Sequence, residues 1–136
     1  MRRRKGALSF DFGMKHIGVA SVEVTSRIVG PKCTLSANHG KLNIDQLDFL
    51  IDAWQPTDLV VGLPLNMDDS ESKMSKAARK FGQFLEKRFR LPVHFVDERL
   101  SSYEAAQREG TQNADHALAA VAIGETWLHE LIVSRR

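Results

Sequence analysis

The segment ALSFDFGMKHIGVASVEV, residues 7–24, contains two apolar runs separated by a turn around Gly13. Runs of this length bounded by glycine are typical of two strands joined as a hairpin. Side chains alternate between the two faces of a strand, so Asp11 should lie on the face opposite Phe10 and Phe12. A carboxylate is therefore expected where an apolar residue would otherwise pack. A simpler alternative is that Asp11 only introduces the turn.

The rest of the chain changes from strand patterns to helical spacing and back. Strands are expected at Ala7–Asp11, Ile17–Val24, Cys33–Ser36, Leu59–Val61 and Val93–Val96. Gly30-Pro31 is interpreted as a turn, and residues 38–41 as a loop. Helices are expected at residues 44–54, 72–88, 101–109 and 115–131, the first capped by Asn43 and the third opened by a Ser101/Glu104 capping box. The order βββαβαβα predicts one α/β domain over residues 1–136, with a mixed central sheet flanked by helices.

Composition narrows the class of protein. The 136 residues suffice for one domain, and 43% hydrophobic with 26% charged residues is ordinary for a globular protein. No apolar stretch is expected to reach the roughly 18 residues of a membrane span, so we expect no membrane association. The basic residues 2–5 precede too short an apolar run for a signal peptide. With Cys33 as the single cysteine, a reducing, cytoplasmic location is expected.

Positive charge is unevenly distributed, although the net charge is only +2. Many basic residues fall on the helix expected at residues 72–88 and just beyond it: Lys73, Lys76, Arg79, Lys80, Lys87, Arg88 and Arg90. Such clustering favours a nucleic-acid partner. A solvated helix face is the competing interpretation, since the pI of 8.9 lies just below the usual value of about 9.

Three acidic residues stand out by position: Asp11, Glu98 and Asp115. Asp11 ends one expected strand, Glu98 lies just beyond another, and Asp115 opens the last expected helix. Clustered carboxylates are natural ligands for Mg²⁺ or Mn²⁺, which accept substrate phosphates in their open positions. If the fold brings them together, they predict metal-assisted phosphodiester cleavage. Asp115 also has a simpler explanation, because Asp is a favoured helix cap.

Three motifs in the same order, residues 10–20 (FDFGMKHIGVA), 61–68 (VGLPLNMD) and 97–102 (DERLSS), closely resemble the signatures of the YqgF family, also called RuvX. The resemblance extends over about residues 7–131. It implies an RNase H-like fold. It also implies a nuclease that processes the 5′ end of the precursor of 16S ribosomal RNA, in a family described as Holliday-junction-resolvase-like.

The resemblance also implies roles for the acidic residues. Asp11, Glu98 and Asp115 would be the catalytic metal ligands, holding two Mg²⁺ or Mn²⁺ ions about 3.5–4 Å apart. Strand geometry sends Asp97 and Glu98 in opposite directions, so only one easily faces Asp11. The family pattern points to Glu98, which leaves Asp97 to pair with Arg99 or to cap a loop.

Lys15, Asn66 and Arg99 are the candidate substrate-binding residues. Lys15 follows the first carboxylate and could contact phosphate, or could be an exposed turn lysine. Asn66, with Asp68, could orient substrate or simply form a turn. Arg99 could pair with Asp97 or reach the scissile strand. No histidine is needed by this scheme, so His16, His94 and His116 are expected to be peripheral.

Two departures from the family pattern concern substrate engagement. Asp69 stands where relatives usually carry glycine, so either the turn is reshaped or Asp69 bears a positive φ at some cost. The stretch between Glu104 and Asp115 is shorter than usual.

Alternatives to rRNA processing are a branched-DNA endonuclease resembling Holliday-junction resolvases, and a non-catalytic module on ribosomes or repair machinery. The partners expected are structured RNA, branched DNA and ribosomal precursor particles.

Overall fold

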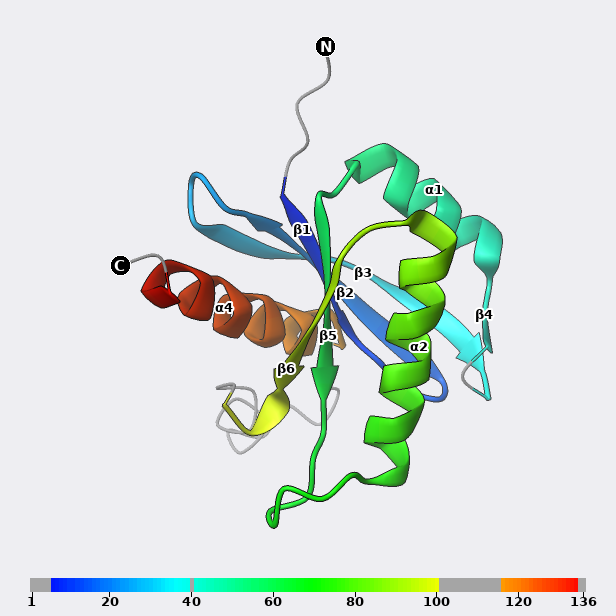
Figure 1. The fold of residues 1–136 in the computed structure, drawn as a ribbon. Coiled ribbons are helices and arrows are strands. Elements are labelled where there is room, and N and C mark those ends of the chain that lie inside the picture. Colours follow the sequence, from blue (N-terminus) through cyan, green and yellow to red (C-terminus); the bar gives the residue numbers. More distant parts are fainter. Residues whose placement is uncertain (1–5, 40, 101–115, 135–136) are drawn as a thin grey trace.

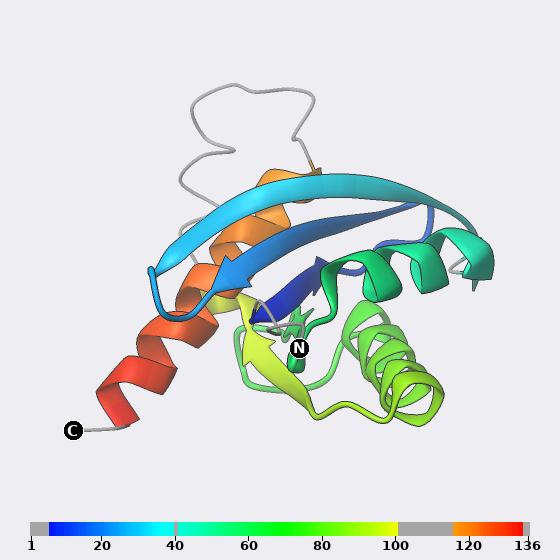
Figure 2. The same cartoon turned by 90° about the horizontal axis from the view of Figure 1, so that it is seen from above.

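In the computed structural model, which describes residues 6–39, 41–100 and 116–134, a six-stranded sheet separates two helical layers. The strands are β1 (Ala7–Asp11), β2 (His16–Glu23), β3 (Ile28–Asn38), β4 (Lys41–Leu42), β5 (Asp58–Leu63) and β6 (Val93–Asp97). The helices are α1 (Ile44–Trp54), α2 (Lys73–Phe89), the single 3₁₀ turn η1 (Glu98–Leu100) and α4 (His116–Ser134). Helices α1 and α2 lie on one side of the sheet and α4 on the other (Figure 1, Figure 2).

The sheet order is β4-β3-β2-β1-β5-β6. Strands β1 to β4 are antiparallel neighbours, whereas β1, β5 and β6 run parallel. Parallel neighbours require crossovers, and α1 and α2 supply them. The carboxyl ends of β1, β5 and β6 therefore meet at one edge of the sheet. The predicted mixed α/β fold is confirmed.

Local signals in the sequence account for the two crossover helices. The Asn43 side chain accepts hydrogen bonds from the first backbone N–H groups of α1, and Ser72 forms a capping box with Ser75 at the start of α2. Each helix ends at a residue in the left-handed conformation, Gln55 and Arg90 respectively. The predictions for both helices are confirmed within about one residue.

The alternation along β1 divides the core between the two faces of the sheet. Leu8 and Phe10 belong to the larger cluster under α1 and α2, whereas Ala7 belongs to the cluster under α4. The buried Ser9 Oγ donates to the carbonyl of Ala120 in α4, 2.7 Å away. Asp11, two residues further along the strand, is therefore directed to the α4 face.

The third strand is longer than predicted, and Pro31 lies inside it rather than in a turn. Val19 lies opposite Cys33 while Ala20 lies opposite Pro31, so Lys32 is the extra residue of a bulge. Proline lacks a backbone N–H and is accommodated at such an irregularity. The loop expected at residues 38–41 is also wrong in part, because Lys41 begins the short strand β4.

Helix α4 corrects one expectation about membranes. By length and composition alone, His116–Ser134 is long and apolar enough to cross a bilayer. In the structure this helix packs on β1, β2 and β3, and its buried residues include several alanines that permit close approach to the sheet. A helix that packs in a protein core is rich in apolar residues, so it meets the same criterion of length and composition. The short helix expected at residues 101–109 lies outside the described residues.

Candidate active site

Asp11 and Glu98 come from two strands separated by β5, yet their side chains meet on the α4 face of the sheet. Asp11 is the last residue of β1, and Glu98 directly follows β6. Gly62 of β5 lies between them. A Cβ atom on Gly62 would lie 2.6 Å from Glu98 Oε1, so the missing side chain provides the space that the Glu98 carboxyl group occupies.

The two carboxyl groups are hydrogen-bonded to each other. Burial, the neighbouring charge of Asp11 and this hydrogen bond raise the pKa of Glu98 to about 8. Burial also raises the pKa of Asp11, against the opposing effects of the Glu98 hydrogen bond and the nearby His116. Glu98 is therefore the protonated member that donates to the Asp11 carboxylate at neutral pH.

His116, which was expected to be peripheral, lies beside this pair. Its charge affects Asp11, and its ring stacks on that of His16 with centroids 4.7 Å apart. The start of α4 is tightly seated, because a Cβ on Gly18 would lie 1.8 Å from the backbone oxygen of His116. The position of His116 directly after Asp115 in the sequence was the signal that could have identified it.

Asp115, the third predicted ligand, lies outside the described residues. Across residues 6–39, 41–100 and 116–134, no group of three or more His, Cys, Asp and Glu side chains is arranged to hold a metal ion. The structure thus brings Asp11 and Glu98 together and leaves the proposed triad as a prediction.

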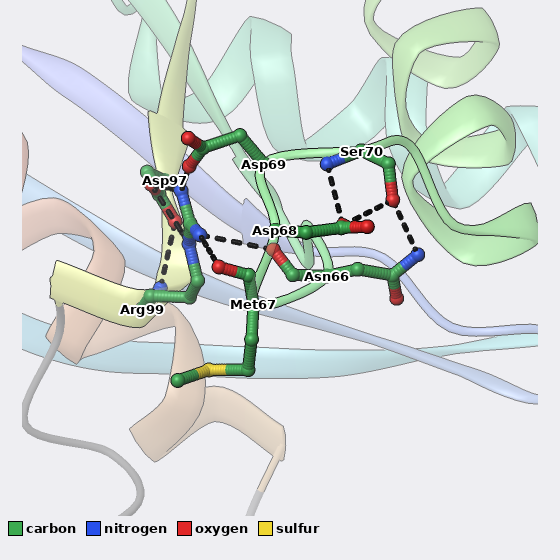
Figure 3. A network of polar contacts seen from close by, with 7 residues as sticks. All are labelled: Asn66, Met67, Asp68, Asp69, Ser70, Asp97 and Arg99. Atoms are coloured by element: carbon green, nitrogen blue, oxygen red, sulfur yellow. Dashed lines mark hydrogen bonds and ion pairs between the residues drawn. The ribbon is translucent and has the colours of Figure 1, made fainter.

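Arg99 lies in a polar network that joins the end of β6 to the loop after β5 (Figure 3). Its guanidinium group donates to Asp97 Oδ2 and Asp69 Oδ1, each at 2.7 Å, and to the carbonyl oxygen of Asn66 at 2.9 Å. The hydrogen bonds from Arg99 are the largest cause that holds the pKa of Asp97 below its usual value. Of the two alternatives for Arg99, pairing with Asp97 is confirmed. Asp97 and Glu98 therefore have separate partners.

The other substrate-binding candidates occupy turns. Asn66 Nδ2 donates to Ser70 Oγ at 3.0 Å, which is turn chemistry within the loop of residues 66–70. Asp69 in the same loop has φ 70°, so of the two alternatives Asp69 bears the positive φ. Lys15 is exposed in the β1–β2 turn, and its carbonyl oxygen accepts a hydrogen bond from Ala37.

Comparison with known proteins places this geometry in a family. Residues 5–130 match the RuvX family, described as Holliday junction resolvase. A protein of Nitrosococcus oceani named "Putative pre-16S rRNA nuclease" is 44% identical over 130 residues, covering 90% of this chain and 86% of its own. A relative of the same name from Hydrogenovibrio crunogenus is 39% identical and covers 91% and 93% of the two chains.

Solved structures agree on the fold. Thermus thermophilus RuvC in complex with a Holliday junction substrate superposes with a TM-score of 0.61 at 13% identity, covering 93% of this chain and 94% of that one. The Fowlpox virus resolvase bound to Holliday junction DNA gives 0.53 at 10% identity, covering 93% and 98%. These likenesses extend to the fold alone, an RNase H-like mixed sheet. From the match over residues 5–130 and the identity to its relatives, the chain belongs to the RuvX family.

Proposed function

We propose that this chain is a divalent-metal-dependent nuclease whose substrate is precursor 16S ribosomal RNA. The observation that carries the proposal is the hydrogen-bonded pair of buried carboxyl groups, Asp11 and Glu98, at the edge where β1, β5 and β6 end. A structural ion pair joins an acid to a base, whereas here two acids are in contact. Perturbed acids in contact are instead typical of functional sites.

The donor set fits a hard cation. Asp11 and Glu98 offer carboxylate oxygens, and a divalent ion would take the place of the proton that now joins them. Asp115, which precedes His116 in the sequence, is proposed as the third ligand. When bound, Mg²⁺ or Mn²⁺ supplies positive charge that stabilises an in-line displacement at phosphorus.

The chain's own residues prepare this site in three ways. Gly62 leaves room for Glu98, so the carboxyl group is held against Asp11. Arg99 pairs with Asp97 at 2.7 Å and so offsets part of the negative charge that Asp97 places beside Glu98. Lys15, exposed next to the end of β1, is proposed to contact a substrate phosphate.

The names of the curated relatives favour ribosomal RNA as the substrate, because they are 39–44% identical across nearly the whole chain. A second candidate is a branched DNA junction, which the description of the matching family favours. The structural likeness to RuvC supports the fold and does not choose between the two substrates.

A single experiment tests the proposal. Purified protein is incubated with a labelled 5′ precursor fragment of 16S rRNA and, separately, with a four-way DNA junction, in Mg²⁺, Mn²⁺ or chelator. We expect metal-dependent cleavage of the RNA, abolished in Asp11→Asn. Cleavage of the junction alone would favour the second candidate. Binding without cleavage in any metal would indicate a non-catalytic module.

A further inference from the structure

A cavity of about 610 Å³ opens on the opposite face of the sheet from the acidic pair. Its walls include Phe12 and Met14 from the β1–β2 turn and Ala77 and Phe84 from α2. Phe12 contacts Phe81 of α2 with ring centroids 5.2 Å apart, which keeps this wall in place. Most of the lining is apolar, and Met14 is 41% exposed.

The rim of this cavity is positively charged. Lys41 from β4 and Lys80 from α2 line it, and both are exposed. The arginines of α2 have acidic partners, since Arg79 pairs with Glu71 and Arg88 with Asp48. In the described segments no ion pair involves Lys41 or Lys80, and no acidic side chain lines the cavity.

We propose that this cavity binds an unpaired nucleotide of the substrate strand, with the base against the half-buried Phe84 and the exposed Met14 and the flanking phosphates at Lys41 and Lys80. This inference rests on the proposed nuclease function and adds a subsite to it. Aromatic walls accept any base by stacking, and lysines at the rim match the charge of the backbone. Phe12 directly follows Asp11, so a strand that passes the end of β1 reaches both faces.

The size and the charge of the cavity favour a nucleotide over a protein segment. Stable protein docking usually engages roughly 20–30 residues on each partner, whereas ten residues line this cavity. A single base needs far fewer contacts. Two lysines without an acidic neighbour also attract phosphates along the approach to the cavity.

The test measures the dissociation constant for short RNA hairpins in chelator, so that cleavage does not intervene. Three probes are compared: a blunt hairpin, the same hairpin with an unpaired extension, and the hairpin with an abasic extension of equal length. For the unaltered chain we expect the bases to tighten binding about 5- to 150-fold relative to the abasic extension, the range of stacking per base.

Variants assign that gain to the cavity. Ala77→Leu fills it without removing core atoms, and Phe84→Ala removes an aromatic wall; both should abolish the dependence on bases. Lys80→Gln should weaken both extended probes equally, whereas Lys87→Gln on the same helix, outside the lining, serves as the matched control. A base-dependent gain that persists in folded Ala77→Leu, or no gain in the unaltered chain, overturns the subsite. Failure to bind even the blunt hairpin would instead count against the proposed function.

Discussion

The carboxyl group of Glu98 donates a hydrogen bond to the carboxylate of Asp11 across the intervening strand β5. Strand alternation directs Asp11 toward α4, and Gly62 leaves the space through which Glu98 reaches it. The contact depends on three segments that are far apart in the sequence. Each contributes a different requirement: a carboxylate on Asp11, a gap at Gly62 and a proton donor on Glu98.

The two adjacent acids Asp97 and Glu98 should respond differently to neutral substitution. In Glu98→Gln the amide can still donate to Asp11, so we expect an unchanged melting temperature in chelator at about pH 4.5, where Glu98 is protonated, but loss of Mn²⁺ binding and cleavage. Asp97→Asn removes the charged partner of Arg99 and should lower the free energy of unfolding by about 1–2 kcal/mol. Calorimetric titration with Mn²⁺ and thermal melts measure both; the reverse pattern would contradict the assignment of Glu98 as the ligand.

Stability without metal should fall as the pH rises from about 4.5 to 8. Glu98 has a pKa of about 8 in the folded chain, above its ordinary value of 4.5, so the folded state binds the proton more tightly than the unfolded state. The stability that the Glu98 proton contributes is fully present below pH 4.5 and is lost as the pH rises to about 8. Because a tenfold difference in proton affinity corresponds to about 1.4 kcal/mol, the loss should exceed about 1 kcal/mol.

Urea unfolding at pH 5 and pH 8 in chelator measures this loss. The comparison is made against Glu98→Gln, which removes only this acid and keeps every other titratable group. The difference in pH dependence between the two proteins should shrink when Mg²⁺ is added, because a bound cation takes the place of the Glu98 proton. Equal pH dependence in both proteins would argue against the shared proton.

Three glycines provide a graded test of close packing around the site. Gly18→Ala places a Cβ 1.8 Å from the His116 backbone oxygen, so we expect a loss of more than about 2 kcal/mol of stability. Gly62→Ala crowds Glu98 and Ile123 and should weaken Mn²⁺ binding as well as stability. Gly30→Ala meets no atom within 4 Å and should change stability by less than about 0.5 kcal/mol. Denaturant melts and metal titrations distinguish the three.

The salt dependence of RNA binding should identify which cations of α2 contact phosphate. Lys73→Gln and Lys76→Gln should each reduce the slope of log affinity against log salt by roughly 0.7–0.9 if they contact phosphates. Arg88→Gln should change it little, because Arg88 already holds Asp48 at 2.6 Å. Affinities measured at several salt concentrations decide this. A slope that none of the lysine variants alters would place the contacts elsewhere.

Asp69→Gly sets two opposing effects against each other. Glycine relieves the positive φ of 70°, a gain of about 1 kcal/mol, but the variant loses the ion pair with Arg99. Asp69 is 82% exposed, and such a pair contributes roughly 0–1 kcal/mol. We therefore expect urea unfolding to show a neutral to slightly stabilised protein. A loss above about 1 kcal/mol would show that the network around Arg99 is more strongly coupled than its exposure suggests.

Much of the fold follows from local patterns in the sequence. Helical spacing, with the capping residue Asn43 for α1, depends on neighbours in the chain and predicted α1 and α2 nearly residue by residue. The bulge at Lys32 was missed because a proline next to a glycine also has the appearance of a turn. Its strand conformation depends on pairing with β2, which no local pattern records.

In the candidate site, too, the features set by local sequence were predicted, and those set by tertiary packing were not. The direction of Asp11 came from alternation within one strand, whereas the choice of Glu98 over Asp97 came from the resemblance to the family. Of the acidic partners of Arg99, Asp97 was predicted because it is close in the sequence. Asp69 was missed because it belongs to another loop. His116 was missed because its place beside Asp11 depends on how closely α4 approaches Gly18.

Helix α4, the last element of the chain, packs closely on the first three strands, so the surroundings of Asp11 are formed by segments from both ends of the chain. Contacts between segments so far apart in the sequence form slowly during folding. Until α4 docks, Ser9 lacks its acceptor on Ala120, and the acidic pair lies on an uncovered face. Completion of folding and enclosure of the acidic pair are thus one event, so a partly folded chain lacks the enclosed pair on which the proposed cleavage depends.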